Sequence, residues 1–196
     1  MESISVRDAR KEDASDIARL MVMAWPVQDF LDLHPGQTLE DFTAFIAGFV
    51  AAEGNLYSYE FTKVAVLTAA DGVEKIVGAM NGYDGARYME LKRPVLEALS
   101  ADAGSGGGFA EAVETEAGEF YLDSAGVDPQ MRSRGIGSLL FKAMLERAAS
   151  EGFKVAGLIV DEDKPAAEAL YLRLGFTVTG YRDFFGHRMK HMQKNL

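Results

Sequence analysis

The segment formed by residues 127–138 constrains the fold more than any other part of the chain, because it reads as a strand that turns sharply into a helix. Gly135 and Gly137 leave the backbone open at the start of this helix, where amides without a helical partner and the helix dipole favour an anion. Arg132 and Arg134 add positive charge beside those amides. The segment therefore predicts a pyrophosphate-binding turn. The alternative is a tight strand-to-helix connection that needs small residues only for packing.

Patterns typical of strands and helices alternate along the rest of the chain, which predicts an α/β fold. Asp71-Gly72 lies between two apolar runs and indicates an antiparallel hairpin. Asp13, Thr38 and Asp163 are the expected helix caps. Strands are expected at residues 3–7, 63–69, 74–83, 120–127, 155–160, 176–181 and 185–192. Helices are expected at residues 13–24, 39–52, 89–100, 136–150 and 164–174.

Residues 84–118 interrupt this alternation. After the expected helix they contain a glycine-rich stretch, residues 104–108, and then the acidic residues Glu111, Glu114 and Glu116. The glycine-rich stretch follows no predicted strand and lacks the Gly-Lys-Ser/Thr ending of a nucleotide-binding loop, so a linker is expected. We predict a single domain over residues 1–196, with an insertion or a flexible flap at 84–118.

Composition excludes several classes of function. The formal net charge is −10, whereas a protein that binds duplex nucleic acid needs clustered Lys and Arg, so no nucleic-acid partner is expected. The absence of cysteine excludes disulfides, thiolate nucleophiles and thiolate metal sites. His187 and His191 have HxxxH spacing, but they fall on an expected strand, ~13 Å apart, so we expect surface histidines and no metal site. No leader or membrane-spanning run is visible, and a cytoplasmic location is expected.

Two motifs in the second half of the chain are similar to those of a known family. Arg132-x-x-Gly135-x-Gly137 resembles the acetyl-CoA motif of the GNAT superfamily of N-acetyltransferases, in which these positions form the pyrophosphate loop. Residues 167–176, Ala-Glu-Ala-Leu-Tyr-Leu-Arg-Leu-Gly-Phe, resemble the second signature, Ala-x-x-Leu-Tyr-x-x-x-Gly-Phe. The motifs occur in the family's order, separated by a helix and a strand.

The resemblance is strong over residues 119–181, weaker over 1–83, and absent from 84–118. It implies a mixed, mostly antiparallel sheet of about seven strands with helices on both faces. It also implies direct transfer of an acetyl group from acetyl-CoA to an amine, without a covalent enzyme intermediate. The lack of cysteine agrees with this route.

The resemblance assigns the cosubstrate to the backbone of the fourth strand and to the pyrophosphate loop. The Val127 amide would polarise the thioester carbonyl. Lys164 stands where the family often has an asparagine that contacts the pantetheine arm, so it either reaches a phosphate or faces solvent. The other residues expected to bind acetyl-CoA are Ala125, Arg132, Ser133, Arg134, Gly135, Ile136, Gly137 and Ser138.

The resemblance also indicates the general acid, whereas the candidates for the general base come from the strand pattern. Tyr171 resembles the family's general acid, which protonates the departing thiolate; the alternative is a tyrosine packed between helix and sheet. Asp123 is the first candidate for the general base and Glu119 the second, because both alternate on one face of the fourth strand; either could be an ordinary exposed carboxylate. Aromatic and apolar residues before the second helix either line an acceptor pocket or belong to the core; these are Trp25, Phe30 and Leu33.

The expected function is acetyl-CoA-dependent N-acetylation of a small molecule or an exposed peptide amine. The acidic composition favours a cationic acceptor, although it also serves solubility. Two alternatives stay open: a non-catalytic acyl-CoA-binding regulatory module, and acetylation of a protein terminus. A homodimer is a further expectation from the resemblance.

Overall fold

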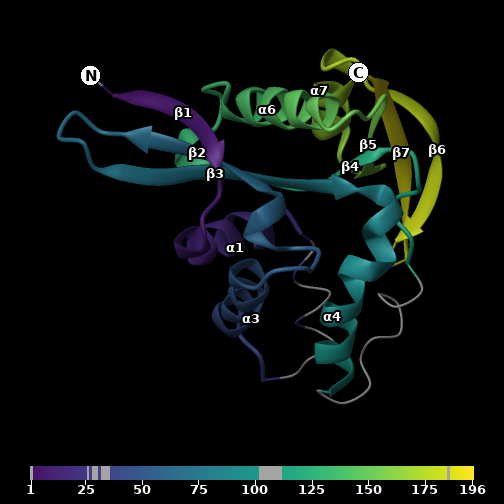
Figure 1. Cartoon of the computed structure of the whole chain (residues 1–196), viewed down its shortest axis with the longest axis horizontal. Helices are drawn as coiled ribbons and strands as arrows, with labels where there is room; N and C mark the ends of the chain where they lie inside the picture. Colours follow the sequence, from purple (N-terminus) through teal and green to yellow (C-terminus); the bar gives the residue numbers. More distant parts are fainter. Residues whose placement is uncertain (1, 26, 28–30, 32–35, 102–111, 185) are drawn as a thin grey trace. The chain divides into compact units, whose positions relative to one another are not determined.

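The computed structural model describes residues 2–25, 27, 31, 36–101, 112–184 and 186–196 (Figure 1). The expected glycine-rich linker at residues 104–108 lies outside the described residues, as do Phe30 and Leu33. The chain forms two compact units, each built from two segments: Met1–Gly82 with Ser124–Met144 (unit 1), and Tyr83–Asp123 with Leu145–Leu196 (unit 2). The single domain with an insertion at 84–118 stays a prediction.

Seven strands form a sheet with the order β1-β2-β3-β4-β5-β7-β6. The pairs β1–β2, β2–β3, β5–β7 and β6–β7 are antiparallel, whereas β4 and β5 are parallel. The mixed, mostly antiparallel sheet that the sequence predicts is therefore confirmed. The strands are β1 Ser3–Asp8, β2 Thr62–Thr68, β3 Glu74–Asp84, β4 Phe120–Val127, β5 Val155–Asp161, β6 Thr177–Phe184 and β7 His187–Asn195.

Five helices of more than one turn lie in the described part of the chain: α1 Ala14–Val22, α3 Leu39–Ala51, α4 Tyr88–Ala101, α6 Ile136–Ser150 and α7 Pro165–Arg173. Within unit 1, α1 and α3 lie on one side of β1–β3 and the start of α6 lies on the other (Figure 1). None of the helices in the described ranges is both long enough and apolar enough to cross a bilayer.

Two glycines bring helices of unit 1 close to its strands. A Cβ at Gly78 would lie 3.0 Å from side-chain atoms of Ile136 and Leu140, so its absence lets α6 approach β3. A Cβ at Gly126 would lie 2.0 Å from the backbone oxygen of Leu20, so α1 crosses β4 at a point where only glycine fits. These contacts hold the last residues of β4 and the first turn of α6 in place.

Of the three predicted helix caps, Thr38 is confirmed, Asp13 is confirmed in its position at the start of α1 but not in its side-chain contact, and Asp163 is wrong. Thr38 caps α3 as predicted: its hydroxyl accepts from the Asp41 amide at 3.1 Å, and the Asp41 carboxylate accepts from the Thr38 amide. Asp13 does not cap α1 with its side chain, because its carboxylate binds the Arg7 guanidinium and the amide of Arg10. Lys164, rather than Asp163, precedes the first residue of α7.

Candidate active site

In unit 1, β4 passes into α6 through a turn held by Asp128. The Asp128 carboxylate accepts from the amide of Gln130 at 3.0 Å, and the Asp128 amide donates to the Val77 oxygen at 2.9 Å. Lys75 Nζ lies 3.3 Å and an Arg19 nitrogen 3.9 Å from the second carboxylate oxygen. These contacts tie the beginning of the turn to β3 and to α1.

Left-handed backbone shapes the rest of the turn. Ser133 has φ +62° and Gly135 has φ +76°, backbone angles that are rare for residues that carry a Cβ. The first hydrogen bond of α6 joins the Leu139 amide to the Gly135 oxygen at 3.0 Å, so the amides of residues 136–138 have no acceptor within the helix. A Cβ at Gly135 or Gly137 would meet no described atom within 4 Å beyond the adjacent chain and helix backbone.

The predicted phosphate-binding residues thus combine open backbone with local positive charge. Arg132, Ser133, Arg134 and Ser138 are exposed, whereas the Ile136 side chain is buried and can offer only its backbone. Arg132 Nε donates to the Val127 oxygen at 3.4 Å, which holds this guanidinium beside the turn. Amides at a helix start together with two arginines can bind a diphosphate.

Burial alternates along the last half of β4. Ser124 and Gly126 are buried, whereas Asp123, Ala125 and Val127 are half-exposed and alternate with them, as expected for side chains on one face of a strand. Ser124 is tied to other elements of unit 1 by polar contacts: its amide donates to Asn81 Oδ1 and its hydroxyl accepts from Trp25 Nε1, both at 2.9 Å. Trp25, for which the sequence left a pocket position and a core position open, also packs against Tyr57, with 5.1 Å between the ring centroids.

In unit 2, β4 and β5 pair over only the first two residues of β4, Phe120↔Ala156 and Tyr121↔Gly157. Leu122 and Asp123 continue beyond this paired stretch. One Asp123 carboxylate oxygen accepts a hydrogen bond of 2.6 Å from the hydroxyl of Tyr83, whose side chain is buried. The half-exposed carboxylate is therefore held in a defined orientation.

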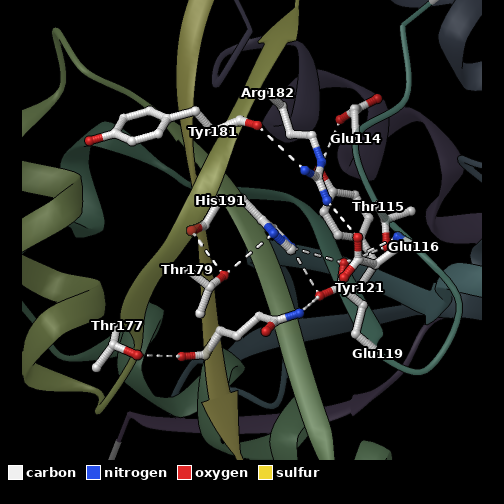
Figure 2. Close-up of polar contacts among 11 residues, drawn as sticks. Glu114, Thr115, Glu116, Glu119, Tyr121, Thr177, Thr179, Tyr181, Arg182 and His191 are labelled. Atoms are coloured by element: carbon white, nitrogen blue, oxygen red, sulfur yellow. Dashed lines mark hydrogen bonds and ion pairs between the residues drawn. The ribbon is translucent and has the colours of Figure 1, made fainter.

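Glu119, the second candidate base, immediately precedes the first residue of β4 and is 1% exposed. Its carboxylate contacts His191 Nε2 at 3.0 Å, and it accepts from Gln193 Nε2 and from the Thr115 hydroxyl, each at 2.7 Å (Figure 2). A Cβ at Gly157 would overlap this carboxylate. Burial by itself raises the pKa of Glu119, but the hydrogen bonds from His191, Gln193 and Thr115 outweigh burial and lower the pKa below its ordinary value.

The expectation that both histidines lie on the surface is wrong for His191. Its side chain is 3% exposed, because β7 is an inner strand between β5 and β6 and His191 points at Glu119 (Figure 2). His187, at the beginning of β7, is 40% exposed and contacts Asp161. The two side chains therefore have separate carboxylate partners. No group of three or more potential metal ligands occurs among the residues that the structure describes.

Glu114 is a buried carboxyl that the sequence did not single out. Its two oxygens accept hydrogen bonds of 2.9 Å from the hydroxyls of Tyr88 and Tyr121. Burial and the nearby charge of Asp123 raise the pKa of Glu114 to about 8, against the opposing effect of the two hydroxyls and of Lys92. It lies in the segment that the sequence predicts as an insertion or a flexible flap, and no local pattern indicated burial.

Tyr171 lies in α7, and Lys164 is exposed just before that helix. The Tyr171 side chain is half-buried and packs edge-on against the Phe176 ring, with 6.3 Å between ring centroids. Burial raises the pKa of the Tyr171 hydroxyl, so this phenol stays protonated at neutral pH. A protonated phenol is able to donate a proton.

Comparison with known proteins agrees with these features. A family model described as the acetyltransferase (GNAT) family matches residues 65–176, more than half of the chain. A mycothiol acetyltransferase from Nocardioides sp. is 33% identical over 114 residues, which are 58% of this chain and 32% of that protein. The chain thus spans about a third of the length of this curated relative.

Solved structures share the fold along nearly the whole chain. One, described as an acetyltransferase, is 29% identical with a TM-score of 0.70 and covers 97% of this chain and 98% of its own. An N-acetyltransferase from Staphylococcus aureus Mu50 is 22% identical with a TM-score of 0.78, covering 96% and 99%. The match of the family model and the shared fold confirm the resemblance seen in the two motifs, and the chain belongs to the acetyltransferase (GNAT) family.

Proposed function

We propose that this protein is an acetyl-CoA-dependent N-acetyltransferase that moves an acetyl group directly to a primary amine of a small molecule or peptide. The observation that supports this most is the open turn at the start of α6, where the amides of residues 136–138 have no acceptor within the helix. Such amides, with Arg132 and Arg134 beside them, suit the pyrophosphate of coenzyme A.

In this proposal the cosubstrate runs along β4. Ser133, Gly135, Ile136, Gly137 and Ser138 offer backbone groups to the diphosphate, and Ala125 and Val127 offer theirs to the pantetheine arm. The Val127 amide polarises the thioester carbonyl and stabilises the negative charge that develops on its oxygen. Lys164, which is exposed, adds a charge that either meets a phosphate or stays in solvent.

Asp123 is the proposed general base, and Glu119 the less favoured choice. Asp123 is half-exposed, held by Tyr83, and two residues from Ala125 in the strand. Glu119 is almost fully buried and its oxygens already accept from Gln193 and Thr115, so its contacts suit a structural role better. Removal of a proton from the acceptor ammonium by Asp123 leaves a neutral amine that attacks the thioester carbon.

Coenzyme A binding and a screen of amines test the proposal together. With acetyl-CoA present, release of free thiol is followed for a polyamine, an aminoglycoside and a basic peptide, and calorimetry with coenzyme A measures binding. We expect heat on binding and amine-dependent thiol release with at least one acceptor. Binding without turnover on any acceptor would favour a non-catalytic acyl-CoA-binding module. Absence of heat at millimolar coenzyme A would refute the proposed cosubstrate site.

Tyr171 is the proposed general acid, and Tyr171→Phe is the variant that tests it. Loss of the hydroxyl is expected to lower kcat by about 10²-fold, the lower end of the usual range for general acid–base catalysis, because the thiolate then departs without a proton. The affinity for coenzyme A should stay within a factor of about two, since packing against Phe176 is preserved. Tyr181→Phe, on an exposed residue of β6, is the matched control. Unchanged turnover in Tyr171→Phe would remove the role.

A further inference from the structure

Glu114 lies in a polar cluster that the proposed transfer does not yet use. Its carboxyl is buried between the hydroxyls of Tyr88, in α4, and Tyr121, in β4, at 2.9 Å from each. A third group of the cluster, the ammonium of Lys92, is buried in α4 and donates to the Ala112 oxygen at 2.5 Å. Such a buried carboxyl needs a partner for each of its protonation states.

The contacts of Tyr88 provide a partner for both states. Its hydroxyl lies 2.9 Å from Glu114 Oε1 and 3.3 Å from the Ala112 oxygen. When Glu114 is ionised, Tyr88 donates to it. When Glu114 carries a proton, the carboxyl donates to the Tyr88 oxygen and Tyr88 donates to the Ala112 carbonyl instead. The cluster therefore accepts a change in the protonation of Glu114 without leaving a buried donor unsatisfied.

Asp123 is the second carboxyl of this cluster. The Tyr83 hydroxyl donates to it at 2.6 Å, and the Tyr83 ring lies 5.9 Å, centroid to centroid, from the ring of Tyr121, which donates to Glu114. The negative charge of Asp123 contributes to raising the pKa of Glu114 and the pKa values of the Tyr83 and Tyr121 hydroxyls. Two carboxylates that interact across a partly buried cluster disfavour double ionisation.

We propose that Glu114 and Asp123 form a coupled carboxyl pair in which Glu114 holds a proton while Asp123 stays ionised, so that Glu114 is a positioning residue for the base. This inference rests on the proposed function, in which Asp123 accepts the proton of the acceptor ammonium. Two protons leave the acceptor nitrogen as its bond to the acetyl carbon forms and the carbon–sulfur bond breaks. One passes through Asp123 to solvent, and the other replaces the proton that Tyr171 gives to the thiolate.

The pair has a pH dependence of definite sign. Glu114 stays protonated below a pH of about 8. In that range the neutral carboxyl adds no negative charge beside Asp123. Above that pH Glu114 ionises, and its negative charge raises the proton affinity of Asp123, which makes Asp123 a stronger base. The described groups that face Glu114 are Tyr83, Tyr88, Lys92, Tyr121 and Asp123. Burial raises the pKa values of Tyr83 and Tyr121 well above 10, so these phenols do not titrate in this range.

Carbon-13 NMR of protein labelled at the glutamate carboxyl carbon tests the pair without any acceptor. We expect one signal with a titration midpoint near pH 8, absent from Glu114→Gln. In Asp123→Asn the midpoint should fall by about one pH unit or more, because the charge that raises it is gone. Glu97→Gln, on an exposed residue of α4, is the control and should leave this signal in place. A midpoint near the ordinary value of a glutamate, or one that Asp123→Asn leaves unchanged, overturns the inference.

The pH dependence of kcat/KM adds a second readout with the best acceptor from the amine screen. The wild-type profile should contain a rise centred near pH 8 that Glu114→Gln lacks and Glu97→Gln keeps. The same rise in Glu114→Gln would overturn the inference. Failure of this inference and failure of the proposed function can be told apart. The expected NMR titration without turnover of any amine refutes the proposed function but still supports the coupled carboxyl pair.

Discussion

Asp123→Asn is expected to lower kcat for acetyl transfer by about 10²–10⁴-fold, the usual contribution of a positioned general base. An amide does not take a proton from an ammonium, so only the small fraction of acceptor that is already neutral can react. The affinity for coenzyme A should change little, because the proposed diphosphate contacts come from residues 132–138. Steady-state kinetics with saturating acetyl-CoA, together with calorimetric titration of coenzyme A, measures both quantities.

The asparagine variant should keep the fold, because its Oδ1 can still accept the 2.6 Å hydrogen bond from the Tyr83 hydroxyl. Asp183→Asn, on an exposed residue of β6, controls for the change in net charge. If Asp123→Asn turns over at a rate close to wild type while Glu119→Gln is inactive but folded, the base is Glu119 and the assignment made here is wrong.

Glu119→Ala is expected to lower the free energy of unfolding by about 3–5 kcal/mol, because several buried polar groups lose their partner at a cost of roughly 1–3 kcal/mol for each. His191 and Gln193 then lose a buried carboxylate at 3.0 and 2.7 Å, as does the Thr115 hydroxyl. In a chain of this size the loss corresponds to a fall in Tm of roughly 10 °C. Urea denaturation followed by circular dichroism measures the change in the unfolding free energy.

Glu116→Ala is the matched control, three residues earlier in the same loop. Its ion pair with Arg182 is 2.7 Å long, but the Glu116 side chain is 58% exposed, so a loss of at most about 1 kcal/mol is expected. Equal losses in both variants would contradict a special role for the buried pair. Because the pKa of Glu119 is lowered in the folded state, its contribution is present above the pKa of an unfolded glutamate and is lost as the pH falls through the folded value.

The elements with strong local signals could be predicted from the sequence. The predicted strand at 120–127 and the predicted helix at 136–150 have the same bounds as β4 and α6. The Asp71-Gly72 hairpin is confirmed by the antiparallel pairing of β2 and β3. Apolar spacing, a capping residue and glycines at a turn act over a few neighbouring residues, so the linear sequence carries these signals.

The sequence could not predict which side chains are buried or which polar groups contact each other, because both depend on residues brought together from distant parts of the chain. His191 looked like a surface residue until β7 proved to be an inner strand, which places it against Glu119, 72 residues away. Glu114 lies in the segment expected to be an insertion or a flexible flap, yet its carboxyl is held by Tyr88 of α4 and Tyr121 of β4. Folding alone decides which carboxyls leave water, and that loss of hydration, together with the new hydrogen bonds, sets their pKa values.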